Sequence, residues 1–201
     1  MKTGVRIARI VKSNSHVDYV ARVIDALDTG DAPAEGDYGF ARFVSIPLTD
    51  IDVIGVVYNS ELVNPEYGSF GPRLSPRADL AVLSPDYLSE QGILLGIILL
   101  GWLDRRTMTY RQAIPSRIIP VNQDVFTMDD DEMCAFHRSE SEKVQLHYYS
   151  QVITHTKMFG VALLEAIIEQ METRMGPEEK TRLAVLRKAL VWQRTIGGLR
   201  L

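Results

Sequence analysis

Short runs of Val, Ile, Leu and aromatic residues, bounded by Gly, Pro, Asn and Ser, fill the first half of the chain. Runs of this kind are typical of β-strands. Residues 17–24 alternate apolar and polar positions closely enough to predict a half-buried strand, and the turn-forming Ser13-Asn14-Ser15 before them predicts a hairpin with the apolar residues 5–11. Further strands are expected at the apolar runs of residues 39–46, 53–59, 79–83 and 94–103.

The longest apolar run covers residues 92–103. It is too short to cross a membrane as a helix, which takes about 20 residues. The run therefore predicts a strand that is buried on both faces. No apolar leader segment follows Met1, so a cytoplasmic protein without a membrane partner is expected.

A long loop rich in Pro and Gly is predicted over residues 60–77. Long ordered loops are either pinned onto the core or used in function. Both alternatives stay open here. In the functional alternative, Tyr67, Phe70 and Arg73 would contact a partner.

The spacing of apolar residues changes to three and four in the second half of the chain, which predicts one long amphipathic helix over residues 140–175. Ser139 and Glu142 fit a capping box at its start. Gly176 would end this helix and Pro177 would begin a second one. A helix of that length would reach about 54 Å, so we expect it to pack against something beyond its own barrel, such as another copy or another protein.

Together these patterns predict an α+β fold, with about six strands followed by a long C-terminal α-helical hairpin. That the strands close into a small antiparallel β-barrel is implied by the family resemblance described below. The expected division is a barrel domain over residues 1–120, an acidic linker over residues 121–137 and the helical hairpin over residues 138–201.

Composition narrows the class of protein. The chain has 201 residues, 46% hydrophobic and 24% charged, with a net charge of -4, as in an ordinary globular protein. The charge is shared evenly between the two halves, which argues against a basic module that binds nucleic acid wholesale. The single cysteine, Cys134, excludes an internal disulfide.

No motif predicts catalysis. The P-loop pattern and the Gly-x-Ser-x-Gly nucleophile elbow are both missing from the sequence. Cys134 and His137 offer two metal ligands without a second pair. Asp50 and Asp52 flank a strand start, where Asp is ordinary turn material. We therefore predict no catalytic, cofactor-binding or metal-binding residues, and a protein that is not an enzyme.

One basic cluster stands out, close in sequence to Trp102 and Tyr110. It could contact nucleic acid or an acidic partner. The alternative is a solvated edge that discourages strand pairing. The cluster consists of Arg105, Arg106, Arg111 and Arg117.

Several segments together resemble the HAS-barrel, the small β-barrel at the N-terminus of HerA-type hexameric DNA-translocating ATPases and, more distantly, of rotary ATP synthase subunits. The resemblance covers about residues 4–120. It is carried by Arg-Ile-Val-Lys-Ser-Asn-Ser-His-Val-Asp-Tyr at 9–19, Gly-Phe-Ala-Arg-Phe-Val at 39–44, Ile-Gly-Val-Val-Tyr-Asn-Ser at 54–60, and the segments at 64–77 and 83–88.

In that family the barrel is an assembly element that sits on the ATPase ring and, in HerA, contacts a NurA-type nuclease used in DNA end processing. The family's catalysis lies in a RecA-like domain, which is not found in these residues, so no catalytic residue carries over. The resemblance implies a non-catalytic subunit that docks onto a HerA-type ATPase, a NurA-type nuclease or its own copies. The alternative is a nucleic-acid-binding module that uses the barrel and the Arg105–Arg117 cluster.

Overall fold

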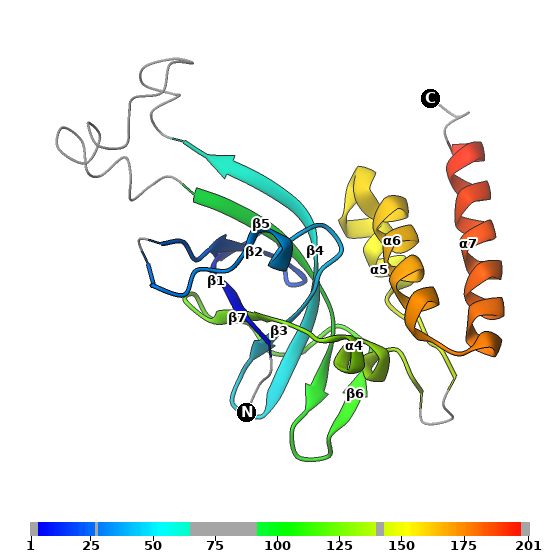
Figure 1. The fold of residues 1–201 in the computed structure, drawn as a ribbon, viewed down its shortest axis with the longest axis horizontal. Coiled ribbons are helices and arrows are strands. Elements are labelled where there is room, and N and C mark those ends of the chain that lie inside the picture. The colour runs from blue at the N-terminus through cyan, green and yellow to red at the C-terminus, as the bar shows by residue number, and fades with distance from the viewer. Residues whose placement is uncertain (1–3, 27, 65–91, 140–142, 198–201) are drawn as a thin grey trace.

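The computed structural model describes residues 4–26, 28–64, 92–139 and 143–197 (Figure 1). The strand predicted at residues 79–83 and most of the loop predicted at residues 60–77 lie outside these ranges. The description that follows concerns the described residues alone.

A closed antiparallel barrel of six strands forms the first part of the molecule, as the sequence predicted. The hydrogen-bonded order is β2-β1-β7-β3-β4-β5, and a further pairing of β2 with β5 closes it. A seventh strand, β6, pairs with the end of β5. The strands are β1 (Arg6–Ser13), β2 (Asp18–Val23), β3 (Phe43–Pro47), β4 (Ile51–Val63), β5 (Gly92–Asp104), β6 (Thr109–Arg111) and β7 (Asp124–Thr127).

The two longest strands, β4 and β5, have 13 residues each and pair along their whole length. Their central residues are buried on both faces, as predicted for residues 92–103, because the barrel interior lies on one side and helices cover part of the other. Their far ends project beyond the other strands as a curved two-stranded arm (Figure 1). We call this the β4–β5 arm, residues 58–63 and 92–95.

The segment predicted as an acidic linker, residues 121–137, instead contains β7 and the helix α4 (Asp130–Phe136). β7 lies between β1 and β3 and completes the barrel. Its central Val125 is fully buried, while Asp124 pairs with Arg9 at 2.9 Å. The acidic residues after it are a helix start, since Asp129 and Glu132 form a reciprocal capping box.

The single long helix predicted over residues 140–175 is wrong. The chain forms α5 (Tyr149–His155), the 3₁₀ turn η2 (Lys157–Phe159) and α6 (Gly160–Arg174) instead. Lys157 has a left-handed φ of 53°, which breaks the helix between α5 and α6. A Cβ at Gly160 would lie 3.1 Å from the Cα of Ile153, so this glycine lets the two helices cross closely.

Ser139 does not cap a helix. Its backbone N–H donates to the carbonyl of Lys143 at 2.9 Å, and its hydroxyl accepts from the N–H of Lys143 at 3.2 Å. The residue closes a turn. Because the long helix is divided, its length no longer argues for packing beyond the barrel.

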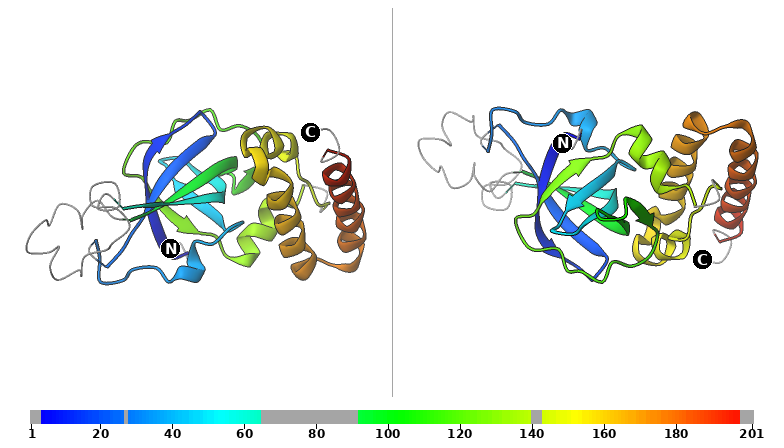
Figure 2. Two further views of the ribbon diagram at one scale, coloured as in Figure 1. Left: turned by 90° about the horizontal axis from the view of Figure 1, so that it is seen from above. Right: turned by 90° about the horizontal axis from the view of Figure 1, so that it is seen from below.

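The predicted helical hairpin is formed by α6 and α7 (Pro177–Gly197), which meet at Gly176 and Pro177 as expected. Seen from above and from below, α6 lies against the barrel and α7 lies outside it (Figure 2). One continuous hydrophobic core joins barrel residues such as Val44 and Ile97 to Leu163 and Ile167 of α6 and Leu183 of α7. None of the helices described has the length and apolar character needed to cross a membrane.

Candidate functional site

Two adjoining apolar cavities lie beside the β4–β5 arm, where the segment between β2 and β3 passes over it. One has a volume of about 410 Å³ and the other about 440 Å³. Both are lined by Tyr38, Leu62 and Ile93, so the two spaces adjoin. We call the combined surface the arm groove.

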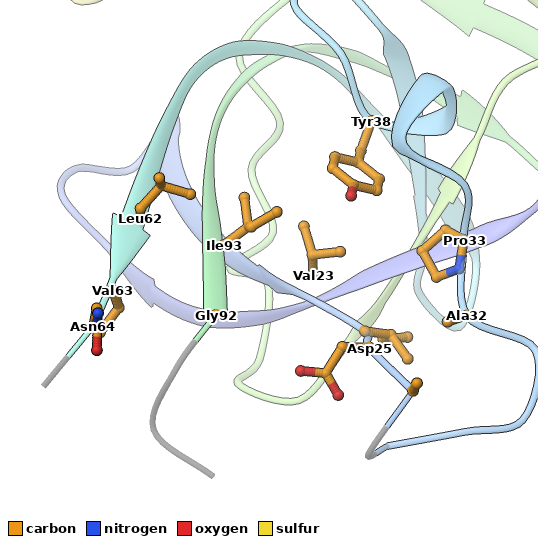
Figure 3. Close-up of a pocket in the computed structure, with 12 residues that line it drawn as sticks. Val23, Asp25, Ala32, Pro33, Tyr38, Leu62, Val63, Asn64, Gly92 and Ile93 are labelled. Atoms are coloured by element: carbon orange, nitrogen blue, oxygen red, sulfur yellow. The ribbon is translucent and has the colours of Figure 1, made fainter. Parts of the chain in front are cut away.

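The first cavity is enclosed by side chains from three strands and the covering segment. Figure 3 shows Val23 of β2, Ile93 of β5 and Tyr38 directed toward one another, with Leu62 of β4 beside them. Pro33 closes the far side. The interior is therefore mainly apolar, with the phenolic oxygen of Tyr38 as a polar group inside it.

The second cavity continues toward the helices and is bordered by exposed apolar side chains. Phe40 and Phe159 lie with ring centroids 6.2 Å apart, at the side opposite β4. Leu62 is 78% exposed, Phe40 is 47% exposed, and Met158, next to Phe159, is 84% exposed. Exposed apolar groups gathered around a groove mark interaction sites more often than isolated ones do.

The covering segment gives the arm groove an acidic border. Residues 24–41 contain no Lys or Arg, and Asp31, Glu35 and Asp37 all lie in this stretch. Burial, followed by the negative charges of Glu35 and Asp37, raises the pKa of Tyr38 above its usual value. Glu61 of β4 is exposed as well, on the face of the strand opposite to Leu62.

The nearest arginine on β2 is already neutralised. Arg22 pairs with Asp28 at 2.9 Å and with Asp25 at 3.3 Å. The backbone N–H of Asp25 and the Arg22 guanidinium both hydrogen-bond to Asp28, and these bonds lower the pKa of its carboxyl despite some burial. The net field at the arm groove is therefore negative.

The outer edge of β4 changes character along the groove. Up to Val57 it is occupied, since Val57 accepts from the N–H of Ala41 at 2.8 Å and donates to the carbonyl of Arg42 at 2.9 Å. From Asn59 to Val63, no strand in the described part of the chain pairs with this edge, although β5 pairs with the other one. The second cavity reaches this open edge at Asn59 and Ser60 and extends over the face of the arm to Ile93 and Leu95 of β5.

Tyr58 holds the base of the arm in place. Its ring crosses over Gly96 of β5, where a Cβ would come within 3.0 Å of the ring, and its hydroxyl donates to Asp18 of β2 at 2.9 Å. Burial first and the Asp18 carboxylate second raise the pKa of Tyr58 far above its usual value, so the hydroxyl stays a donor.

The predicted partner-contact residues Tyr67, Phe70 and Arg73 lie outside the described residues. The predicted basic cluster is described, and two of its members come together. Arg105 pairs with the buried Asp52 at 2.6 Å, and Arg117 approaches Asp50 at 3.5 Å.

These two ion pairs are part of the fold at the start of β4, and they reduce the positive charge that the cluster could offer to a ligand. The other two arginines lie apart from the pairs. Arg106 is in the turn after β5, where its backbone N–H donates to Asp104, and Arg111 ends β6. Arg111, Trp102 and Tyr110 line a separate open cavity of about 860 Å³, together with Arg138 and His147.

The Cys134 and His137 pair does not form a metal site. Both imidazole nitrogens of His137 are engaged, Nδ1 with the carbonyl of Met133 at 2.7 Å and Nε2 with the hydroxyl of Tyr148 at 2.6 Å. Burial raises the pKa of the Cys134 thiol, which disfavours the thiolate that binds metals. Over the described ranges, no three His, Cys, Asp or Glu side chains are grouped so that they could hold a metal ion.

The sequence interpretation missed the residues that form the arm groove. Phe40 was assigned to a strand and Leu62 to a loop, although Phe40 precedes β3 and Leu62 lies in β4. Phe159 was assigned to the predicted long helix, although it lies in the turn η2. One signal was available, since a run of acidic residues without a basic one, followed by Tyr38 and Phe40, is unusual next to a barrel strand.

Comparison with known proteins gives a family and no described activity. Residues 1–200 match the model of a family described as Domain of unknown function (DUF8166). Among curated proteins there is no match.

Proposed function

For this chain, which belongs to the DUF8166 family, we propose the role of a non-catalytic assembly subunit that docks onto a HerA-type DNA-translocating ATPase, or onto its NurA-type nuclease, in DNA processing. The proposal combines the resemblance of about residues 4–120 to the HAS-barrel with the closed six-stranded barrel. In the HAS-barrel family this element serves assembly.

The observation that carries the proposal is the arm groove. It is mainly apolar and is lined by the exposed Phe40 and Leu62 and by Phe159. The continuous hydrophobic core of the described residues leaves Phe40 and Leu62 outside it. A surface of this kind is costly to leave in water, at about 25 cal/mol for each Å² of apolar area. A protein partner that covers it would recover that free energy.

The test is the mass in solution. Multi-angle light scattering is applied to the purified full chain, alone and mixed with a HerA-type ATPase and with a NurA-type nuclease from the same organism. We expect a complex that co-elutes with one of them. A chain that stays a monomer in both mixtures would refute the proposal, and a homo-oligomer that ignores both would replace it with self-assembly.

A second candidate function, nucleic-acid binding, is favoured by one observation. Arg111, Trp102 and Tyr110 line the same open cavity, which offers a cation and two aromatic rings to a single strand. Because Arg105 is engaged by Asp52 and Arg106 does not line the cavity, the informative change is Arg111→Ala. If the cavity binds DNA, this variant will bind more weakly and with a flatter salt dependence; unchanged binding would exclude the cavity.

A further inference from the structure

The open edge of β4 and the apolar floor beside it form two halves of one recognition surface. We propose that the arm groove binds an extended segment of a partner protein, which pairs as an added strand with β4 between Asn59 and Val63 and carries basic side chains toward the exposed Glu61 of β4. This inference rests on the proposed role as an assembly subunit and specifies how the partner is held.

The backbone supplies the first part of the argument. A strand that is paired on one edge presents unsatisfied N–H and C=O groups on the other, and an extended peptide can satisfy them. On β4 the covering chain fills this role up to Val57, through Ala41 and Arg42, and then turns away. The second cavity reaches this stretch of β4, since Asn59, Ser60 and Leu62 all line it.

The side chains supply the second part. Alternate residues of an added strand point to one face of the sheet. On the groove side they would meet Tyr38, Phe40 and Leu62, so apolar side chains are expected at every second position of the bound segment. Because Phe40 and Leu62 are partly exposed without a partner, their burial would contribute to binding.

The negative charge around the groove is the third part of the argument, and it indicates which side chains the bound segment carries. The side chains between the apolar ones would point to the other face of the sheet, which carries the exposed Glu61 of β4, while Glu35 of the covering segment lines the groove itself. Arg22 is neutralised by Asp25 and Asp28, and Arg42, which donates to the carbonyl of Gly36 and keeps its charge, is outnumbered by Asp31, Glu35 and Asp37. Lys or Arg at these positions would be attracted, and Asp or Glu would be repelled.

The probe is a capped peptide in which Lys and Val alternate over seven residues, titrated into the full chain and followed by amide chemical shifts and hydrogen exchange. We expect binding that weakens with salt, with new protection at outward amides of β4 between Asn59 and Val63. A Glu-Val peptide of the same length should not bind. Two further peptides carry N-methyl groups on the Val amides or on the Lys amides, and at least one of them should lose binding.

Variants identify the surface. Leu62→Ser should weaken binding of the Lys-Val peptide by about tenfold or more, as for a central anchor of an interface. Ile118→Ser is the matched control, because Ile118 is 74% exposed, close to the 78% of Leu62, and lines no part of the groove. Binding in the control should stay within about twofold of the parent.

The outcomes separate this inference from the proposed function. A Lys-Val peptide that does not bind, that binds equally well to Leu62→Ser, or that tolerates both sets of N-methyl groups overturns the strand-pairing inference. So do amides that are already protected without peptide, which would mean that a second copy or another part of the chain fills the groove. If the complex with the ATPase or the nuclease still forms with Leu62→Ser, the partner is not held in the arm groove, and the proposed function is supported without this docking mode. If the peptide binds as expected and neither complex forms, the peptide-binding groove is supported and the proposed function is contradicted.

Discussion

The buried imidazole of His137 makes the stability of this fold depend on pH in a defined direction. The side chain is fully buried, with Nδ1 at 2.7 Å from the carbonyl oxygen of Met133 and Nε2 at 2.6 Å from the hydroxyl of Tyr148. A carbonyl can only accept, so Nδ1 carries the proton and Nε2 accepts from Tyr148. The neutral form is therefore satisfied at both nitrogens, and a second proton would displace the Tyr148 donor.

The size of the effect follows from the pKa. Burial lowers the pKa of His137 to about 4, from an ordinary value of 6.5, although the bond to Met133 opposes the shift. Between these values the unfolded chain binds a proton that the native protein does not. The free energy of unfolding should therefore be highest above about pH 6.5 and fall as the pH drops toward 4, by about 3 kcal/mol for this group in total, at about 1.36 kcal/mol per pKa unit.

The assay combines two measurements. An NMR titration follows the imidazole protons of the four histidines, and urea unfolding gives the free energy at several pH values from 4.5 to 7.5. His137→Leu should lower stability at neutral pH, because Tyr148 and Met133 lose their partner, and should flatten its pH dependence. His147→Gln is the control, because His147 is exposed, and it should leave the slope unchanged.

Two results would refute this reasoning. One is a His137 resonance that titrates near pH 6.5 in the folded protein. The other is a His137→Leu variant whose stability falls with acid as steeply as that of the parent. Either would mean that the native state accepts the proton without losing the buried geometry.

Two further changes test the packing and the ion pairs. Gly101→Ala would direct a Cβ at the backbone carbonyl of Arg111, which cannot move without shifting β6. We expect the free energy of unfolding, measured with urea, to fall by about 1–3 kcal/mol. A negligible change would contradict the close approach of β5 and β6. Asp52→Asn should cost about 1.5–3 kcal/mol, because the buried carboxylate accepts from Arg105, whereas Asp50→Asn on the exposed pair should cost under about 1 kcal/mol; equal costs would contradict the burial argument.

The strands with strong local signals could be predicted from the sequence. The hairpin of β1 and β2 has turn chemistry between two apolar runs, and β5 has a continuous apolar run, so both were assigned correctly. The short strand β7 gives almost no local signal, since a single Val125 is fully buried in it. It becomes a strand because β1 and β3 leave a gap that only a non-local segment can close.

The helix over residues 140–175 shows the opposite failure. Residues 154–157 are all polar, yet Val152 and Phe159 on either side of them lie seven residues apart, which is two helical turns, so the period alone predicts one helix. The left-handed φ of Lys157 and the close crossing at Gly160 are set by tertiary contacts with α5. The spacing of apolar residues shows which residues face the core. Two helices that share one core keep the same face toward it on both sides of a turn, so the spacing does not reveal the turn.

The arm groove could not be predicted from the sequence, because it also depends on contacts between distant segments. Its floor is made by Tyr38, Leu62 and Ile93, which come from three distant segments that the barrel brings together.

The basic cluster was visible in the sequence, but its carboxylate partners were not, because they are distant in the chain. Asp52, for example, precedes Arg105 by 53 residues.

The distribution of neutralised and open charge favours a protein partner over nucleic acid. Two of the four arginines that suggested phosphate binding are engaged by Asp50 and Asp52, at 3.5 and 2.6 Å. The arm groove, with its exposed Phe40 and Leu62, is bordered by carboxylates instead, which would repel a phosphate backbone and attract a basic peptide. DNA could then reach this subunit through a protein that it holds, and a loss of DNA processing on changing Leu62, with DNA binding by the isolated chain unaltered, is the result expected of such an arrangement.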